Sequence, residues 1–433
     1  MERPRDCRDA VYTDKFCINK LLRQNGRSAT KEITLITSQN RLRGWGCLLT
    51  MLWGASLMAA PQEQSLQYHS QLAQRRSMLD VMGSRSLNLS EKAPDGVQLP
   101  QFQSNQPLFA QWTSPMAQKG RLLIALDRTQ EKGPYDRMFI NLNEDGHLKD
   151  ETEISAGWTS SEIATFGPIE LIFTDSEKPI TYHLNFEFFS YEDSRELTVY
   201  ADGQYEGTIQ VGAEEKYCIL IDYNANGAFN DVALDARQSD RIQIGKPNDR
   251  NSLKTGYVGK FIKIDEQLYE LEVALNGSYI KLTPAQGVTF GMVELPEDIT
   301  EFAVGGENGL FTFRSEKGQV ELPVGKYHIE YWTMLRQDEK GDQWKLQGSE
   351  FGGRGDFGVR AETKTILLIG EPITCGLDIV NTGPATYTLN QIFKGQLDES
   401  IILTRNEALP GDLEIHVKNA DGSYVKTEIL EDA

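Results

Sequence analysis

Short runs of apolar and aromatic residues, separated by turn residues, make up most of the chain after residue 106. Within these runs apolar and polar residues alternate, as in ITYHLNFEFFSY at 180–191 and ELTVYADG at 196–203. Gly, Pro, Asn and Asp separate the runs at intervals of about 8 to 15 residues, a spacing typical of antiparallel sandwiches and barrels. After residue 82 no stretch longer than about ten residues has the 3.6-residue periodicity of a helix. The sequence therefore predicts a mainly β protein of two or three antiparallel β-sandwich-like modules with little helix.

Changes in composition and in this pattern suggest where the modules begin and end. Residues 61–105 are rich in Gln and Ser with scattered Pro, so we expect a linker there, in which QLAQRRSMLDVM at 71–82 can form one short helix. Strand-like runs fill the rest of the chain. The predicted modules are a first β domain at 106–254, a β-sandwich-like module at 255–364 and a small C-terminal β module at 365–433.

Residues 41–60, RLRGWGCLLTMLWGASLMAA, have the arrangement of a secretory signal peptide. Arg41 and Arg43 precede an apolar stretch of about 15 residues that ends in small residues, where we expect cleavage after Ala59 or Ala60. A membrane-spanning helix needs about 20 apolar residues, and no other segment of the sequence approaches this length. We therefore interpret residues 1–60 as a leader and expect an exported protein, periplasmic or extracellular, without a membrane span after signal cleavage.

The charge of the chain narrows the classes of partner. The 433 residues include 44 basic and 63 acidic ones, and removal of residues 1–59 leaves 34 and 58, a net charge of −24. Because an anionic surface repels phosphate backbones and attracts cations, we expect no nucleic-acid partner and consider cations natural ligands. The same cleavage leaves Cys218 and Cys375, each in an apolar run. An oxidising exterior would permit a disulfide between them, but the sequence favours two separately buried thiols.

Two loops that directly follow predicted strands share the pattern D/N-x-N-x-D/N-G-x-φ-x-D, in which φ is apolar. Oxygen-bearing residues at positions 1, 3 and 5 converge when such a chain curls, Gly at position 6 permits the sharp turn, and position 7 offers its carbonyl. The apolar residue at position 8 anchors the loop in the core. The predicted metal ligands are Asn141, Asn143, Asp145, His147 and Asp150 in the first loop and Asp222, Asn224, Asn226, Ala228 and Asp231 in the second.

These ten-residue segments resemble the calcium-binding loops of EF-hands and of dockerin-type modules, and the resemblance implies calcium as the bound ion. Both loops depart from the EF-hand at position 12, where Thr152 and Ala233 replace the bidentate Glu, so the carboxylate at position 10 must take its place. Asn in place of Asp lowers the ligand charge, and we expect dissociation constants of about 10⁻⁴ to 10⁻³ M, as in extracellular modules. A hairpin turn without metal is the alternative, because Asn226-Gly227 and Asp145-Gly146 both suit type I′ turns.

A second resemblance concerns the segment 291–330. It contains Leu322-Pro323-Val324-Gly325-Lys326-Tyr327, which is similar to the Leu-Pro-x-Gly-x-Tyr signature of transthyretin-like or carboxypeptidase-regulatory-like sandwich modules. Pro and Gly form the tight turn in this pattern, and Tyr then alternates into the core. The resemblance implies a β-sandwich and carries no activity.

The sequence provides no motif for catalysis. It contains no HExxH, no GxSxG elbow, no P-loop and no GxGxxG at a strand-to-helix turn. His183 and His328 lie beside aromatic residues in strand patterns, so we expect them to be sheet residues rather than metal ligands. A glycosidase needs two carboxylates held about 5–10 Å apart, and such pairs occur by chance in so acidic a chain.

These observations favour a non-catalytic binding or structural β-protein of the cell exterior, stabilised by calcium, with polysaccharide or another envelope protein as candidate partners. The alternative is a secreted carbohydrate-active or other hydrolase that uses a carboxylate pair in a cleft between modules. A third interpretation is an envelope assembly protein that presents edge strands to another chain, and long unprotected edge strands would favour it.

Overall fold

The computed structural model describes residues 62–70, 83–174, 179–191, 194–315, 317–383, 386–410, 413–418, 423 and 425–430. The leader predicted at 1–60 and the short helix predicted at 71–82 lie outside the described residues. The chain forms two compact units. The larger unit contains the described residues up to Thr333 together with Gly348–Ile401, and the smaller contains Met334–Gln347 and the described residues from Ile402 onward.

Strands account for nearly all the regular structure. In the described part of the chain the only helical segments are three short 3-10 turns, Ala236–Gln238, Arg250–Ser252 and Gly352–Gly355. The strands form several sheets whose pairing is mostly antiparallel. The prediction of a mainly β fold of sandwich-like antiparallel modules with little helix is confirmed.

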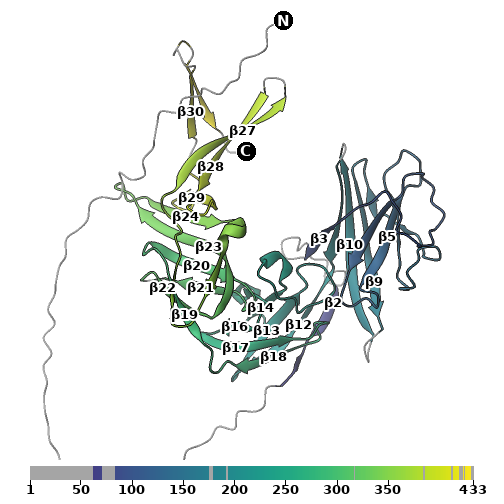
Figure 1. Cartoon of the computed structure of the whole chain (residues 1–433), viewed down its shortest axis with the longest axis horizontal. Helices are drawn as coiled ribbons and strands as arrows, with labels where there is room; N and C mark the ends of the chain where they lie inside the picture. Colours follow the sequence, from purple (N-terminus) through teal and green to yellow (C-terminus); the bar gives the residue numbers. More distant parts are fainter. Residues whose placement is uncertain are drawn as a thin grey trace, which may run out of the picture. The chain divides into compact units, whose positions relative to one another are not determined.

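The first sandwich of the larger unit consists of the two sheets drawn in dark blue in Figure 1, with the strand orders β4-β5-β6-β7 and β3-β11-β10-β9-β8. Every second residue of β10 from Tyr182 to Phe188 is buried, as the alternating sequence predicts. Aromatic rings meet between the two sheets: Trp112 of β4 stacks on Phe173 and Tyr182, and Tyr135, in the loop before β6, packs edge-on against Phe188. The strands are β3 Ser84–Leu87, β4 Leu108–Thr113, β5 Arg121–Asp127, β6 Arg137–Ile140, β7 Ile154–Ser155, β8 Trp158–Thr159, β9 Ile163–Phe173, β10 Ile180–Tyr191 and β11 Ser194–Ala201.

Strands β5 and β6 are buried on both faces. On the face opposite the sandwich core, Phe109, Leu123 and Phe139 form a second apolar cluster with Leu148, and side chains between 93 and 102 pack against it. Ordinary half-buried strands leave one face to water, so this irregular segment takes the role of a further layer. It completes the packing of the sheet without forming strands of its own.

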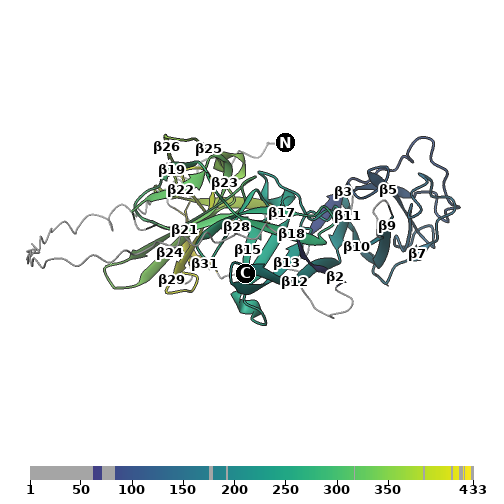
Figure 2. The same cartoon turned by 90° about the horizontal axis from the view of Figure 1, so that it is seen from below.

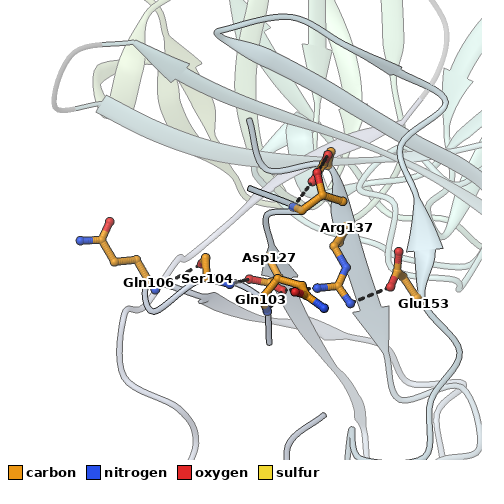
Figure 3. A network of polar contacts seen from close by, with 8 residues as sticks. Gln103, Ser104, Gln106, Asp127, Arg137 and Glu153 are labelled. Carbon is orange, nitrogen blue, oxygen red and sulfur yellow. Dashed lines mark hydrogen bonds and ion pairs between the residues drawn. The ribbon is translucent and has the colours of Figure 1, made fainter. Parts of the chain in front are cut away.

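A buried polar network fastens this covering segment to the end of β5 (Figure 3). The fully buried carboxylate of Asp127 accepts hydrogen bonds from the backbone N–H groups of Gln103 at 2.8 Å and Ser104 at 3.1 Å. Arg137 donates to the same carboxylate at 2.6 Å and to Glu153 at 2.6 Å. Buried charges are tolerated when they are paired and hydrogen-bonded in this way, so the network ties three segments together.

The second sandwich is built from the sheets β15-β14-β13-β12-β2 and β1-β18-β17-β16, and Figure 2 shows β2, β12 and β13 side by side. Its inner residues include Tyr205, Cys218, Leu220, Ile242 and Ile280, which belong to the same apolar cluster as the core of the first sandwich. The two cores are therefore continuous. The strands are β1 Gln64–Ser65, β2 Gln67–Ser70, β12 Gly203–Val211, β13 Glu214–Ile221, β14 Arg241–Gly245, β15 Lys254–Tyr257, β16 Phe261–Ile264, β17 Gln267–Val273 and β18 Tyr279–Pro284.

The segment 61–105, for which the composition predicts a linker, contributes strands to three sheets. β1 pairs with β18, β2 with β12 and β3 with β11, in each case antiparallel. These strands are short and polar, and their partners lie far away in sequence. No local sequence pattern therefore predicts them. The predicted boundary at 254/255 falls within β15, which pairs with β14. The boundaries of the modules stay predictions.

The other strands before β30 form a small sheet, β22-β19-β26, and a long one, β21-β20-β23-β24-β29-β28-β27, with β25 paired to β23. β19 and β26 pair in parallel. The turn between β22 and β23 contains the Leu-Pro-x-Gly-x-Tyr pattern, and the buried Tyr327 hydroxyl donates to the Pro323 carbonyl at 2.7 Å. The strands are β19 Phe290–Glu294, β20 Ile299–Gly305, β21 Phe311–Arg314, β22 Gln319–Pro323, β23 Gly325–Gln337, β24 Gln343–Ser349, β25 Asp356–Val359, β26 Lys364–Ile366, β27 Thr374–Gly383, β28 Thr386–Lys394 and β29 Ser400–Arg405.

The smaller unit contains the hairpin of β30 (Leu413–Lys418) and β31 (Val425–Leu430). Another part of it is held by Asp342, which accepts a hydrogen bond from Nε of Arg405 at 2.9 Å and one from the side-chain amide of Asn406 at 2.9 Å. The Arg405 guanidinium lies 5.6 Å from the centre of the Trp344 ring. These contacts join the segments on either side of residues 348–401 within this unit.

The two cysteines lie in β13 and β27, and two of the histidines lie in strands. Cys218 and Cys375 are free thiols, as favoured by the sequence, but only Cys218 is buried. Cys375 is exposed because it lies on β27, which is exposed along most of its length, so the prediction of a second buried thiol is wrong. His183 lies in β10 and His328 in β23, which confirms both as sheet residues. Among the described residues no helix is both long and apolar enough to cross a membrane.

Candidate cation-binding loops

Both predicted loops begin at the end of a strand, the first after β6 and the second after β13. The apolar residue at position 8 is buried in each case, Leu148 with no exposed surface and Phe229 with 1%. Leu148 belongs to the cluster on the outer face of β5, and Phe229 packs edge-on against Tyr205 at a ring separation of 5.0 Å. The predicted anchoring of the loops in the core is therefore observed.

The second loop is organised around the fully buried carboxylate of Asp222. Its two oxygens accept hydrogen bonds from the backbone N–H groups of Asn226 at 3.2 Å and Gly227 at 2.6 Å. The Tyr182 hydroxyl of β10 donates to the same carboxylate at 2.7 Å. The chain reverses through left-handed conformations at Ala225 (φ 50°) and Gly227 (φ 89°), of which the second suits only glycine well.

Two amide side chains and a second carboxylate meet inside this loop. The side-chain amide nitrogens of Asn224 and Asn226 donate to one oxygen of Asp231, at 3.1 and 2.6 Å. Asn224 is 5% exposed, and its buried Oδ1 has no hydrogen-bond partner in the described part of the chain. A buried acceptor without a partner costs about 1–3 kcal/mol. An amide oxygen of this kind has the chemistry of a ligand for a hard cation.

A third carboxylate, which the sequence analysis did not single out, completes the cluster. Asp240 is fully buried and accepts hydrogen bonds from the backbone N–H groups of Tyr223 at 3.0 Å and Asp231 at 2.8 Å. It lies immediately before β14, outside the ten-residue pattern. The only signal in the sequence is an acidic residue directly before a buried strand, which is too common to identify a ligand.

The buried carboxylates of Asp222 and Asp240 have raised pKa values. Burial raises the pKa of Asp222 to about 6, against the hydrogen bonds from Tyr182, Gly227 and Asn226 that lower it. Burial, followed by the negative charges of Asp222 and Asp231, raises the pKa of Asp240 well above its usual value. Burial lowers the pKa of the Arg85 guanidinium in β3, and the negative charges of Asp222 and Asp231 raise it by less. A cation at the cluster would relieve these repulsions.

Carboxylates alone do not make a metal centre here. In the part of the chain that the structure describes, no group of three His, Cys, Asp or Glu side chains is placed to hold a metal ion. A cation at the second loop would need amide and carbonyl oxygens as well, from Asn224, Asn226 and Ala228. Calcium takes about six to eight oxygen ligands of this mixed kind, so the donor set suits calcium better than zinc.

The first loop has a different internal arrangement. The side-chain nitrogen of Asn141 donates to side-chain oxygens of Asn143 at 2.8 Å, Asp145 at 3.0 Å and Glu151 at 3.4 Å. An amide N–H group thus lies where these oxygens converge, and Nζ of Lys119 donates to the Asp145 carbonyl at 2.7 Å. As in the second loop, amide N–H groups here donate to the oxygens that would otherwise face a cation.

The two other predicted ligands of the first loop face different partners. Nδ1 of His147 accepts a hydrogen bond from the backbone N–H of Gln98 at 3.1 Å. The group of His147 predicted as a ligand is its backbone carbonyl, and this stays a prediction. Asp150 is exposed, and its neighbour Glu151 supplies the carboxylate that approaches Asn141 and the backbone of Asn143. The structure therefore brings together Asn141, Asn143 and Asp145, and among the described side chains of this loop no buried acceptor lacks a hydrogen-bond partner.

Comparison with known proteins adds no relative. The chain matches no protein-family model, no curated protein and no solved structure. The resemblances to EF-hand and dockerin-type loops and to transthyretin-like modules stay predictions.

Proposed function

We propose that the protein is an exported, non-catalytic binding or structural component of the cell exterior that calcium stabilises through the loop 222–231. The observation that carries this proposal is the buried Oδ1 of Asn224, which has no hydrogen-bond partner in the described part of the chain, in a loop whose Asp222 is also buried. The leader-like segment 41–60 and the acidity of the remaining chain support a calcium-rich exterior as the place of action.

The burial of the loop supports a structural role for the ion. Asp222, Ala225, Ala228 and Phe229 are all buried, and Asn224 is nearly so. A catalytic metal keeps a coordination position open to substrate, whereas a structural ion is enclosed by protein ligands. An ion among these residues would be enclosed, and its binding free energy would be added to the stability of the fold.

Calcium is expected to raise the melting temperature of the purified protein, with magnesium as the control ion. At a tenfold excess of calcium over its dissociation constant the gain is about 1.4 kcal/mol, or about 2–4 °C for a domain of this size. Differential scanning calorimetry in EDTA and then across about 10 µM to 10 mM calcium measures the shift. Asp231→Asn should abolish it, whereas Asp145→Asn in the first loop should leave it unchanged. A folded protein whose melting temperature ignores calcium would contradict the proposal.

The hydrolase alternative has less support from the described surface. A groove of about 590 Å³ lies beside β3 and β4, where Arg85, Lys92, Gln111 and Asp95 are among the lining residues. Asp95 is its one carboxylate. This groove therefore does not supply the pair of facing carboxylates that glycoside hydrolysis requires.

A second candidate function, assembly through an edge strand, is favoured by β27. This ten-residue strand ends its sheet, seven of its residues are exposed, and its single charged residue is Asp378. On one face of the β27–β28 ribbon Leu377 and Ile379 lie opposite Gln391 and Leu389. Edge strands are normally protected by charges, Pro or short length, and β27 has little of this protection.

The occupant proposed for this edge is β27 of a second copy of the chain. Antiparallel pairing of two such strands along their full length would place Asp378 opposite Ile379 of the second copy, so like charges would not face each other. Such isologous pairing closes a two-fold dimer. The interaction would extend the sheet through backbone hydrogen bonds.

Sedimentation equilibrium of the purified protein tests this candidate function. The protein is expected to form dimers that Ile379→Lys disrupts at least tenfold in the dissociation constant, because a charge on the edge opposes pairing. Ile392→Lys on β28 is the matched control, since Ile392 is also exposed (39%, against 53% for Ile379) but lies on a strand paired on both sides. A monomer at all concentrations, or equal loss in both variants, would reject pairing through β27.

A further inference from the structure

The sheet β3-β11-β10-β9-β8 buries one face in the core of the first sandwich and leaves the other face partly open to solvent. The side chains of this outer face are half-buried or exposed, and some of them are large and aromatic. Trp158 of β8 is 55% exposed, and Tyr191 of β10 is 51% exposed. Apolar side chains that remain in water on one face of a sheet provide surface that a ligand can cover.

The outer face is also acidic. Glu170 of β9, Glu187 of β10 and Glu196 of β11 each lie next to buried residues in their strands, so all three occupy the outer side. The two arginines of these strands alternate to the inner side, and among the described residues of the sheet no Lys or Arg occupies an outer position. Nε2 of His183 lies 3.6 Å from Glu170. Charge complementarity therefore favours a cationic ligand.

Glu187 lies in the middle of this face. Its neighbours across the sheet are Thr165 of β9 and Thr198 of β11, which are small enough to leave space beside the carboxylate. Glu196 accepts hydrogen bonds from the hydroxyl groups of Ser86 and Thr198. For the carboxylate of Glu187, no hydrogen bond or ion pair occurs within the described part of the chain. Glu187 is thus the carboxylate of this face that still lacks a counter-charge or a donor.

Aromatic rings surround the position of Glu187. Phe189 follows two residues later on the same side of β10, and Trp158 lies two strands away in the same row of the sheet. Burial, followed by the negative charges of Glu187 and Glu196, raises the pKa of Tyr200. The phenol of Tyr200 therefore lies close to both carboxylates. Carboxylates beside aromatic rings bind ammonium and guanidinium groups through ion pairs and cation–π contacts.

We propose that this outer face binds a Lys- or Arg-rich segment of another protein, with Glu187 receiving a cationic side chain among Phe189, Tyr200 and Trp158. The inference rests on the proposed function, because it gives a partner to a binding component of the cell exterior, but it does not require calcium. A face that extends over five strands suits a macromolecular partner. Its negative charge excludes nucleic acids and acidic polysaccharides, so a basic protein segment is the partner that fits.

Isothermal titration of the purified full-length protein with an octalysine peptide tests this proposal, in EDTA and at about 50 mM salt so that screening is weak. Glu187→Gln is expected to weaken binding about fivefold, because it removes the charge that pairs with the ligand. Trp158→Ala is expected to weaken it about threefold through the lost cation–π contact. Glu321→Gln is the matched control, since Glu321 is exposed on β22 in another sheet, and binding should stay within about twofold.

The outcomes separate this inference from the proposed function. Equal losses in the Glu187 and Glu321 variants would overturn the inference, because the net charge of the protein would then explain the binding. Tighter binding of a glucosamine oligomer of equal charge would overturn the assignment to a protein partner. Absence of peptide binding in a folded protein whose melting temperature rises with calcium would overturn the inference alone. Peptide binding with the expected variant effects in a protein that ignores calcium would support the inference and contradict the calcium-stabilised function.

Discussion

Trp112→Ala is expected to lower the free energy of unfolding of the larger unit by about 3–5 kcal/mol. The Trp112 side chain has no exposed surface and stacks on Phe173 and Tyr182. Its removal leaves a cavity in the core of the first sandwich, because the surrounding sheets can collapse only partly. It also leaves the buried Ala225 carbonyl without the indole donor at 2.7 Å. Both effects act in the same direction.

Chemical denaturation followed by circular dichroism measures this loss. Trp158→Ala is the matched control, since Trp158 is 55% exposed and lies on the short edge strand β8. Surface substitutions of this kind change stability by about 0.5 kcal/mol or less. Similar losses in the two variants would show that Trp112 does not occupy the core position described for it.

Arg137→Met is expected to cost about 3–5 kcal/mol, because it leaves the charge of Asp127 buried without its partner. The two side chains are almost fully buried and 2.6 Å apart (Figure 3). The backbone N–H groups of Gln103 and Ser104 also depend on the Asp127 carboxylate, so the cover over Phe109 and Phe139 should loosen with it. Methionine retains the apolar stem of the side chain, which isolates the effect of the charge.

The same denaturation assay, with Arg195→Met as reference, tests the prediction. Arg195 pairs with Glu91 at 3.0 Å, but the two side chains are 34% and 82% exposed. Such surface pairs contribute about 0–1 kcal/mol. A loss of less than about 1 kcal/mol in Arg137→Met would mean that the network of Asp127 is dispensable for the fold.

The sequence predicts the long strands well and the short ones poorly. In β10 the alternation of apolar and polar residues alone indicates a strand with one buried face. β1, β2 and β3 have few apolar residues, and they are strands because the edges of β18, β12 and β11 offer backbone partners. Their existence depends on pairing across long sequence separations, which no local window contains.

The candidate site shows the same division between local and long-range information. The turn at Gly227, the burial of Phe229 and the convergence of Asn224, Asn226 and Asp231 all follow from a ten-residue pattern. The pattern contains no information on Asp240, which reaches the loop only because β14 returns beside β13. It also does not distinguish the two loops, and in both of them amide N–H groups donate to neighbouring side-chain oxygens.

The pairing of β1 with β18 has a consequence for the order in which the chain folds. Gln64 lies opposite Ile280, and Tyr68 of β2 lies opposite Tyr205. Such non-local pairs must wait for loop closure, and folds dominated by them form slowly. During synthesis the edge positions beside β18 and β12 are filled by strands made long before their partners. Neither sheet of the second sandwich can therefore be completed until most of the larger unit has left the ribosome, and until then its N-terminal strands have no native partner.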